Sequence, residues 1–396
     1  MDGDIVAIAA ARTALGSFGG SFRQTPVYDL GAAVIEAVLE RAGVPGEEID
    51  RVILGHCRQA GNGPNPARTA SVKGGIPTAV PAVTVNMACP SAMKAVMLAG
   101  QEIASGNVRI VLAGGMESMS TMPYLLKDVR WEGFKLGDKT LSDAWSDTID
   151  PLCGFGMGMT AENQVQKYGI SRAAQDEFAL ASQQKAAKAQ GEGLTEAEIV
   201  PVKLPPTRRN PGGATVARDE TIRPDTNLER LSKLKPVFLA DGSVTAGNSC
   251  AMGDGACAIL LTSRGNAKAM GLAPLFSIVS AAEAAVEPET MGDGPARSVP
   301  LALEKAGMSL DDMDFIEINE AFAAQIIANE RALKWDRGKL NLYGGAIALG
   351  HPTGISGARI LITLDNILRR NDKELGVAGI CGGGGVTTAM VIRREG

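Results

Sequence analysis

One pattern occurs twice in the sequence, and this internal repeat constrains the fold more than any other feature. Residues 37–53 (AVLERAGVPGEEIDRVI) align without gaps with residues 301–317 (LALEKAGMSLDDMDFIE). Each copy shows the end of an amphipathic helix, a glycine stop, an acidic turn and an apolar strand. The repeat therefore predicts two similar halves within the chain of 396 residues.

The same order of segments continues in both halves. Three further pairs correspond: residues 83–96 with 346–359, 108–115 with 377–384, and 256–262 with 387–393. These correspondences place Cys89 opposite His351 and Ala113 opposite Cys381. Strands that alternate with helices favour an α/β fold in which each half has a mostly parallel sheet covered by helices.

The first half contains an insertion that the second half lacks. Residues 118–249 lie between two strands whose counterparts near Cys381 are separated only by a short turn, and they are too many for a plain loop. Within the insertion, Thr160 is expected to open one helix, and Ser171 to cap another that ends near Gly191. We therefore expect a division into residues 1–117 with 250–272, residues 118–249, and residues 273–396.

Composition excludes several classes of function. The chain has 39 Lys and Arg residues against 44 Asp and Glu, a net charge of −5, and 45% hydrophobic residues, which argues against a nucleic-acid scaffold and against disorder. No apolar stretch is long enough to span a membrane, and the first residues lack the apolar run of a signal peptide. Six cysteines without a C-x-x-C motif and only two histidines exclude common metal sites. We therefore expect no metal, nucleic acid or membrane partner, and reduced thiols in the cytoplasm.

Two of the paired segments carry candidate catalytic side chains. Pro90 is a natural first helical residue, so Cys89 is expected at a helix N-terminus, after a buried strand, where the helix dipole favours a thiolate. The alternative is that Cys89 is a small buried hydrophobe. His351 occupies the equivalent place in a glycine-rich turn, where it could act as a base for the thiol or be a structural residue.

Two strand ends carry further candidates. Cys381 leads into four glycines at the end of a predicted strand, and Asn319 follows the strand that ends in Ile318. The alternatives are a simple turn at Cys381 and a helix cap at Asn319. A thiol nucleophile, one imidazole, a second thiol and glycine-rich amide donors together favour acyl transfer through a covalent acyl-enzyme.

The motifs in combination resemble those of the thiolase family, which includes acetyl-CoA acetyltransferases and 3-ketoacyl-CoA thiolases. The resemblance extends over essentially the whole chain and rests on these segments: ARTALGSFGGSF (11–22), NPARTAS (65–71), the Cys89 segment NMACPSAM (86–93), GGMESMS (114–120), MGMTAEN (157–163), TAGNS (245–249) with DGA (254–256), NEAFA (319–323), GGAIALGHPTGISGAR (344–359) and CGGGG (381–385). It implies two duplicated α/β halves with mixed sheets covered by helices, plus an inserted loop or cap domain. The implied activity is acyl transfer between a 3-oxoacyl-CoA and coenzyme A, in the thiolytic or the condensing direction.

The resemblance also implies roles for individual residues. Cys89 would be the acylated nucleophile, His351 its base, and Cys381 the group that moves a proton at C2 of the acetyl unit. Asn319 would hold a water near the thioester oxygen, and the amides of Cys89 and Gly383 would form a second oxyanion hole. No permanent cofactor is implied, because coenzyme A is itself a substrate.

The insertion would contribute to binding of coenzyme A. The substrate contacts implied by the resemblance are Arg223, Met157, Phe238, Ala246, Gly247, Cys250, Phe322 and Met291. The stretch from Lys203 to Lys235 is basic within an acidic chain, which is compatible with a dock for a polyphosphate nucleotide. The alternative is that these charges form an ordinary solvated face. The basic residues of the stretch are Lys203, Arg208, Arg209, Arg218, Arg223, Arg230, Lys233 and Lys235.

Five positions depart from the usual family pattern, namely Pro90, Ala92, Gly156, Arg230 and Cys250. These departures suggest an acyl pocket unlike that of a plain acetoacetyl-CoA enzyme, so we hypothesise a less usual 3-oxoacyl-CoA substrate. Similar proteins form homodimers or homotetramers, and residues 122–138 resemble an association loop.

Two alternative functions remain open at this point. A ketoacyl-synthase-like condensing enzyme would need a second histidine or an asparagine beside its cysteine, whereas His56 lies outside any comparable motif and Cys381 has no place in such a triad. A non-catalytic acyl-CoA-binding scaffold would be expected to have lost a reactive residue. All four candidate reactive residues are nevertheless present, namely Cys89, His351, Cys381 and Asn319.

Overall fold

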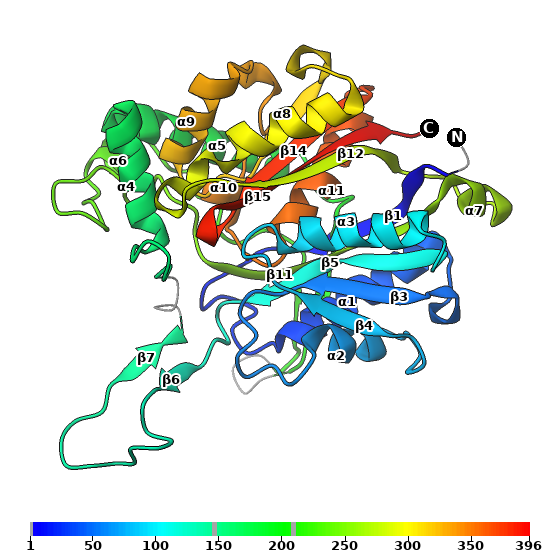
Figure 1. Cartoon of the computed structure of the whole chain (residues 1–396), viewed down its shortest axis with the longest axis horizontal. Coiled ribbons are helices and arrows are strands. Elements are labelled where there is room, and N and C mark those ends of the chain that lie inside the picture. The colour runs from blue at the N-terminus through cyan, green and yellow to red at the C-terminus, as the bar shows by residue number, and fades with distance from the viewer. Residues whose placement is uncertain (1–2, 145–148, 207–210) are drawn as a thin grey trace.

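Two α/β halves pack together with an inserted segment at their side (Figure 1). The structure is a computed structural model that describes residues 3–144, 149–206 and 211–396. The α-helices are α1 (Val27–Ala42), α2 (Pro66–Lys73), α3 (Ser91–Ala104), α4 (Met157–Tyr168), α5 (Arg172–Gly191), α6 (Leu228–Ser232), α7 (Arg264–Ala269), α8 (Gly294–Ala306), α9 (Ala323–Leu333), α10 (Ala346–Leu349) and α11 (Ser356–Arg370). The strands are β1 (Ile5–Thr13), β2 (Gly16–Ser17), β3 (Arg51–Gly55), β4 (Ala82–Val85), β5 (Ile110–Ser118), β6 (Tyr124–Leu126), β7 (Leu141–Asp143), β8 (Ile199–Val200), β9 (Val202–Leu204), β10 (Ala214–Val216), β11 (Gly253–Ser263), β12 (Phe276–Ala285), β13 (Phe315–Ile318), β14 (Leu375–Cys381) and β15 (Val386–Arg394).

The order of the strands confirms the repeat. Reading across the hydrogen-bonded ladder, the order is β13-β14-β15-β12-β1-β11-β5-β3-β4. The sequence β3, β5, β11, β1 on one side mirrors β13, β14, β15, β12 on the other. The two halves join where β1 meets β12, through the pairs Val6–Ser277 and Ala7–Phe276. An approximate two-fold relation between the halves therefore passes through this junction.

The expectation of mostly parallel sheets is wrong, and the mixed sheets implied by the family resemblance are correct. Within the main ladder, β3 runs parallel to β4 and β5, and β13 runs parallel to β14, whereas β5–β11, β11–β1, β14–β15 and β15–β12 are antiparallel. The turn at Gly382–Gly385 explains one of these reversals, because so short a connection can join only antiparallel neighbours.

Helices α3 and α11 lie in the middle of the molecule and pack against each other. Helix α3 also packs on β3 and β5, and α11 packs on β13 and β14, while α1 covers the first half and α8 the second from outside. Every residue from Ser356 to Leu368 in α11 is buried, since neighbouring elements surround the helix. Cys89 directly precedes the Pro90 cap of α3, and His351 lies shortly before α11, so this packing draws the two segments together.

Three local predictions need correction. Strand β4 is not buried and does not reach Cys89: it ends at Val85, lies at the edge of the ladder, and leaves Val83 44% exposed. Helix α4 begins at Met157 instead of Thr160, because the Thr160 hydroxyl bonds back to the Met157 carbonyl within the first turn. Pro90 is the N-cap of α3 and not its first helical residue.

The second helix of the insertion begins as predicted. The Ser171 hydroxyl accepts a hydrogen bond from the Ala174 amide at 3.2 Å, which caps α5. The division of the chain at residues 117, 250 and 273 stays a prediction.

A buried ion-pair cluster attaches the insertion to β1. The Arg12 guanidinium donates to Glu198 at 2.8 Å and to both carboxylate oxygens of Asp219 at 2.8 and 3.0 Å. Asp219 also accepts from the Leu15 amide at 2.8 Å. Although burial opposes the charge of Arg12, the two carboxylates raise its pKa above the ordinary value.

Replacing Arg12 with methionine is expected to destabilise the protein by about 3–5 kcal/mol, because two buried carboxylates lose their counter-charge. Denaturant titration would measure the change. The matched control is Arg109→Met, since Arg109 also pairs with two carboxylates but is 64% exposed; it should cost about 0–1 kcal/mol. Equal effects of the two substitutions would contradict the importance of the buried cluster.

Candidate active site

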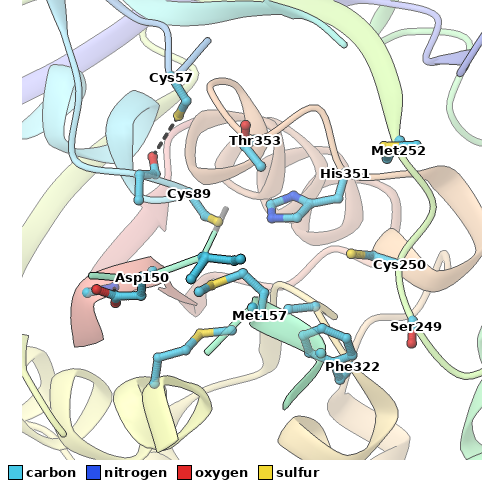
Figure 2. Close-up of a pocket in the computed structure, with 18 of the residues that line it drawn as sticks. Cys57, Cys89, Asp150, Met157, Ser249, Cys250, Met252, Phe322, His351 and Thr353 are labelled. Atoms are coloured by element: carbon cyan, nitrogen blue, oxygen red, sulfur yellow. Dashed lines mark hydrogen bonds between the residues drawn. The ribbon is translucent and has the colours of Figure 1, made fainter. Parts of the chain in front are cut away.

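A cavity of about 510 Å³ lies between the ends of the two central helices, and residues of both halves and of the insertion line it. Figure 2 shows Cys89 and His351 facing each other across this cavity, with Met157 and Phe322 below them. Gly383 also belongs to the lining. The structure therefore brings together the residues that the paired sequence segments singled out.

The segment that carries Cys89 is a tight turn between β4 and α3. Ala88 has a left-handed backbone with φ of 51°, and its carbonyl accepts hydrogen bonds from the Ser91 amide and from the Cys57 thiol, the latter at 3.1 Å. Burial raises the pKa of Cys89 to about 11, although the amides of Gly383 and of Cys89 itself oppose the shift. Burial therefore outweighs the expected pull of the helix dipole toward the thiolate, and without a bound substrate the thiol is favoured.

His351 presents one ring nitrogen to the cavity. Its Nδ1 lies 2.6 Å from the Ser356 hydroxyl, which donates to the Pro352 carbonyl at 3.2 Å, so Nδ1 carries the proton in this bond. Its Nε2 is buried without a hydrogen-bond partner among the described residues and is left as an acceptor. Burial lowers the pKa of His351 to about 4, with Arg359 adding to the shift. The imidazole is therefore neutral at physiological pH and able to take a proton.

Cys381 and Asn319 lie deeper than the cavity wall. Cys381 ends β14, is 1% exposed, and packs in a cluster with Met157, Met291 and Phe322, so burial raises its thiol pKa. Asn319 directly follows β13 and is fully buried. Both polar atoms of its side chain lack a hydrogen-bond partner within the described chain, and it does not cap α9.

The predicted coenzyme A contacts fall into two groups. Met157, Phe238, Cys250, Phe322 and Met291 line the cavity that contains Cys89. Arg223, Ala246 and Gly247 line a second cavity of about 230 Å³. Ala251 belongs to the walls of both, so the two cavities adjoin.

Of the basic stretch, Arg223 and Arg230 line the second cavity. Lys203, Arg218, Lys233 and Lys235 are exposed and line neither of the two. Arg208 and Arg209 lie outside the described residues.

Sequence reasoning missed one residue that connects the two halves, the buried Glu117 at the end of β5. Its Oε1 accepts from His56 Nδ1 at 2.7 Å and from the Arg58 amide at 3.2 Å. Its Oε2 accepts from the Thr353 hydroxyl at 2.8 Å and the Gly354 amide at 2.9 Å, both in the His351 loop. The available signal was an acidic residue at the end of an otherwise apolar strand, which in a buried position needs partners.

A third bond to Glu117 Oε2 reaches the nucleophile turn. The Cys57 amide donates to this oxygen at 3.1 Å, and the Cys57 thiol in turn contacts the carbonyl of Ala88. Although burial opposes ionisation, the hydrogen bond and charge of His56 and the bond from Thr353 hold the pKa of Glu117 down at about 2. One carboxylate therefore ties the turn before Cys89 to the loop that carries His351.

Comparison with known proteins identifies the family of the chain. The family model described as "Thiolase, N-terminal domain" matches residues 5–265, and "Thiolase, C-terminal domain" matches residues 272–394. The chain belongs to the thiolase family. This membership confirms the family resemblance and the acyltransferase class predicted from the sequence.

Individual relatives are similar over their whole length. An acetyl-CoA acetyltransferase of Cupriavidus necator is 46% identical over 99% of this chain and 100% of that protein. A probable acetyl-CoA acyltransferase of Staphylococcus epidermidis is 48% identical over 98% of each. Among solved structures, the Bacillus anthracis acetyl-CoA acetyltransferase superposes with a TM-score of 0.96 at 42% identity, covering 99% of this chain and 98% of that one. Human mitochondrial 3-ketoacyl-CoA thiolase gives 0.95 at 40% identity, with the same coverage. The thiolase-like fold is therefore confirmed.

Among the His, Cys, Asp and Glu side chains in the described ranges, no group of three or more is placed to hold a metal ion. No helix in the described part of the chain is both long and apolar enough to cross a membrane.

For this thiolase-family protein, Glu117→Gln is expected to lower kcat about 10²-fold, because an amide NH2 cannot accept the bonds that hold the two loops, and small misplacements of reacting groups are costly. Steady-state kinetics should show a larger change in kcat than in KM. The control is Glu102→Gln, which removes the carboxylate of a partly exposed pair with Arg51 and should change kcat less than about twofold. A loss of melting temperature without a loss of kcat would contradict the positioning role.

The low pKa of His351 predicts an unusual acid limb in the pH profile. Burial disfavours the imidazolium, so the neutral base persists as the pH falls below 6.5 and is lost only near pH 4. The kcat/KM value at pH 5.5 should therefore exceed half its maximum, with recovery of activity at pH 7.5 as a control for unfolding. An acid inflection at pH 6.5 or higher would show that the imidazole is not shifted.

Proposed function

We propose that this protein catalyses acyl transfer between a 3-oxoacyl-CoA and coenzyme A, with Cys89 as the acylated nucleophile. The observation that carries the proposal is one cavity across which Cys89 and His351 face each other (Figure 2), with the Gly383 amide beside the sulfur. The Nε2 atom of His351 has no hydrogen-bond partner among the described residues, and Cys381 is packed beneath. A thiol, a neutral base, a second thiol and fixed amide donors match the steps that this reaction needs.

In the first half-reaction, His351 Nε2 takes the Cys89 proton as the sulfur attacks C3 of the 3-oxoacyl group. The amides of Cys89 and Gly383 stabilise the oxyanion that forms on the C3 oxygen. The C2–C3 bond then breaks, its electron pair passes to C2, and the Cys381 thiol donates a proton there. Acetyl-CoA leaves, and the shortened acyl chain stays on Cys89 as a thioester.

In the second half-reaction, a coenzyme A thiol attacks the acyl-enzyme carbonyl. Its proton passes to the Cys381 thiolate, and the imidazolium of His351 returns a proton to the Cys89 sulfur as it departs. Both thiols and the imidazole are thereby restored. Asn319 would hold a water near the thioester oxygen, which agrees with two buried side-chain atoms that lack a protein partner in the described chain.

The adjoining cavities suggest how coenzyme A binds. The guanidinium groups of Arg223 and Arg230 in the second cavity would meet the nucleotide phosphates. The pantetheine arm would then pass Ala251 and Cys250 into the first cavity, along a wall that contains Phe238 and Phe322, whose rings pack edge to face. Cys250 would contact the arm where a serine is common in the family.

The alternative functions receive less support. A ketoacyl-synthase-like enzyme would need two histidines at the nucleophile, or a histidine with an asparagine. The first arrangement is not met, because His56 is fully buried and bonded to Glu117 and Asn62. The second, with His351 and Asn319, would leave the Cys381 thiol without a role. A binding scaffold would not need, opposite a thiol, an imidazole nitrogen that lacks a hydrogen-bond partner in the described chain.

We further propose a homodimer or homotetramer in a reducing, cytoplasmic compartment. The β6–β7 hairpin projects away from the body and carries the exposed side chains of Trp131, Phe134 and Leu136, which a second copy could cover (Figure 1). All six cysteines are free thiols. Coenzyme A would serve as a substrate and not as a permanent cofactor.

Replacing Cys89 with alanine is expected to lower thiolysis of acetoacetyl-CoA on the order of 10³-fold or more, because the covalent step is lost. The assay follows the enolate absorbance of the substrate. In parallel, incubation with acetoacetyl-CoA without free coenzyme A should add an acetyl group to the peptide that contains Cys89, as measured by mass spectrometry.

The matched control is Cys153→Ala, since Cys153 is also a partly exposed free thiol but does not line the cavity. This variant should keep wild-type activity and the acetylated peptide. Binding of acyl-CoA without thiolysis and without acylation of Cys89 would favour the scaffold.

A further inference from the structure

The cavity has two sides relative to the reacting pair. In Figure 2, Cys250 and Met252 lie on one side of Cys89 and His351, and Asp150 lies on the other. The first side leads through Ala251 to the cavity that contains Arg223, so it is the side of coenzyme A. The side of Asp150 is therefore where the acyl chain beyond C3 would extend.

A short segment of the insertion forms this far wall and is firmly held. The Asp150 carboxylate accepts from the Gly384 amide at 2.7 Å and from the Leu152 amide at 2.9 Å. The Asp150 amide donates to the Phe155 carbonyl at 2.9 Å, directly before Gly156. The far wall is thus fixed to the turn that supplies the Gly383 amide. Because its backbone is held, the side chains of this segment determine the shape of the wall.

Gly156 leaves a gap in this wall, and its backbone conformation does not require a glycine. It lines the cavity as the N-cap of α4 with φ of −74° and ψ of 159°, a conformation open to any residue. A Cβ built there meets no described atom within 4 Å. By contrast, a Cβ at Gly158 would meet the Phe238 ring at 2.3 Å, and Gly384 has φ of 80°. A glycine can be required by close contact at its Cβ position or by a positive φ. Among the lining glycines of the described chain, only Gly156 is required by neither.

The remaining lining suits an aliphatic chain of variable shape. Apart from Met252 on the side of coenzyme A, three methionines contribute to it, and their flexible thioethers adapt to irregular apolar ligands: Met119, Met157 and Met291. Of the two charged residues in the lining, Asp150 has its carboxylate bonded to backbone amides, while Arg58 lies beside Cys57 near the nucleophile turn.

We propose that Gly156 determines acyl-chain specificity: its missing side chain leaves room for aliphatic 3-oxoacyl groups longer than acetoacetyl. The inference rests on the proposed thiolysis and adds the substrate class. A larger side chain at residue 156 would project into the space that the chain beyond C4 occupies and would discriminate against long substrates.

The test is a series of substitutions at this position, Gly156→Ser, Gly156→Thr and Gly156→Asn. All three new side chains are good helix N-caps, so α4 is preserved while the side-chain size increases. For each variant, kcat/KM is measured for thiolysis of 3-oxooctanoyl-CoA and of acetoacetyl-CoA. The ratio of the two values does not depend on the fraction of enzyme that is correctly folded.

The wild type is expected to act on 3-oxooctanoyl-CoA at least as well as on acetoacetyl-CoA. The ratio should fall about tenfold or more in the Thr and Asn variants, the scale on which pockets discriminate chain length, and less in the Ser variant. The control is Gly191→Ser, because Gly191 is exposed at the end of α5 and a Cβ there also meets nothing within 4 Å. This control should leave the ratio unchanged.

Four outcomes would overturn the inference, and failure of the proposed function is distinguishable from failure of the specificity role. If the wild type cleaves neither substrate, the proposed function itself fails. If it cleaves acetoacetyl-CoA but the Gly156 series leaves the ratio unchanged, or the wild type prefers acetoacetyl-CoA more than tenfold, only the specificity role fails. If an ω-carboxylated 3-oxoacyl-CoA is preferred to 3-oxooctanoyl-CoA, the space serves an anionic chain near Arg58, and the aliphatic substrate class is wrong.

Discussion

The buried carboxylate of Glu117 links the two halves of the molecule at the point where their reactive segments meet. It accepts hydrogen bonds from the loop after β3 and from the loop that carries His351. A buried charge is stable only when its partners remain in place, so this carboxylate opposes any separation of the two loops. The glycines on β3 and β5 assist, because a Cβ at Gly55 or Gly115 would lie 2.7 or 2.1 Å from the Gly354 carbonyl. The distance between Cys89 and His351 thus depends on contacts that neither residue makes itself.

Burial dominates the electrostatics of the site. It raises the pKa values of Cys89 and Cys381 and lowers that of His351, so all three groups are neutral in the absence of substrate. Negative charge would then form only as the Cys89 sulfur attacks a bound substrate. The Gly383 and Cys89 amides already lie beside this sulfur. Such a site needs fixed dipoles more than it needs a preformed thiolate. The helix dipole expected to favour the Cys89 thiolate is outweighed by burial of the sulfur.

Much of the architecture was predictable because the two duplicated halves still have corresponding segments and corresponding residues in the sequence. The correspondence of Cys89 with His351 indicated that two distant segments meet, and the mirrored strand order confirms the symmetry behind it. Strand direction was not predictable from alternation of strands and helices, since parallel and antiparallel neighbours share the same apolar pattern. The start of α4 was misplaced for a local reason: Thr160 can cap a helix or bond within its first turn, and the flanking residues do not distinguish the two.

The sequence by itself determined the repeat, the family, the insertion and the reactive residue types, because these depend on which side chains occur and in what order. Only the tertiary structure decided which of them share a cavity, that Asn319 and Cys381 lie beneath its wall, and that Glu117 connects its two sides. It also decided that Gly156 faces open space while Gly158 lies under a ring. These facts depend on burial and on contacts between segments far apart in the chain, and no local pattern of residues encodes the surroundings that packing creates.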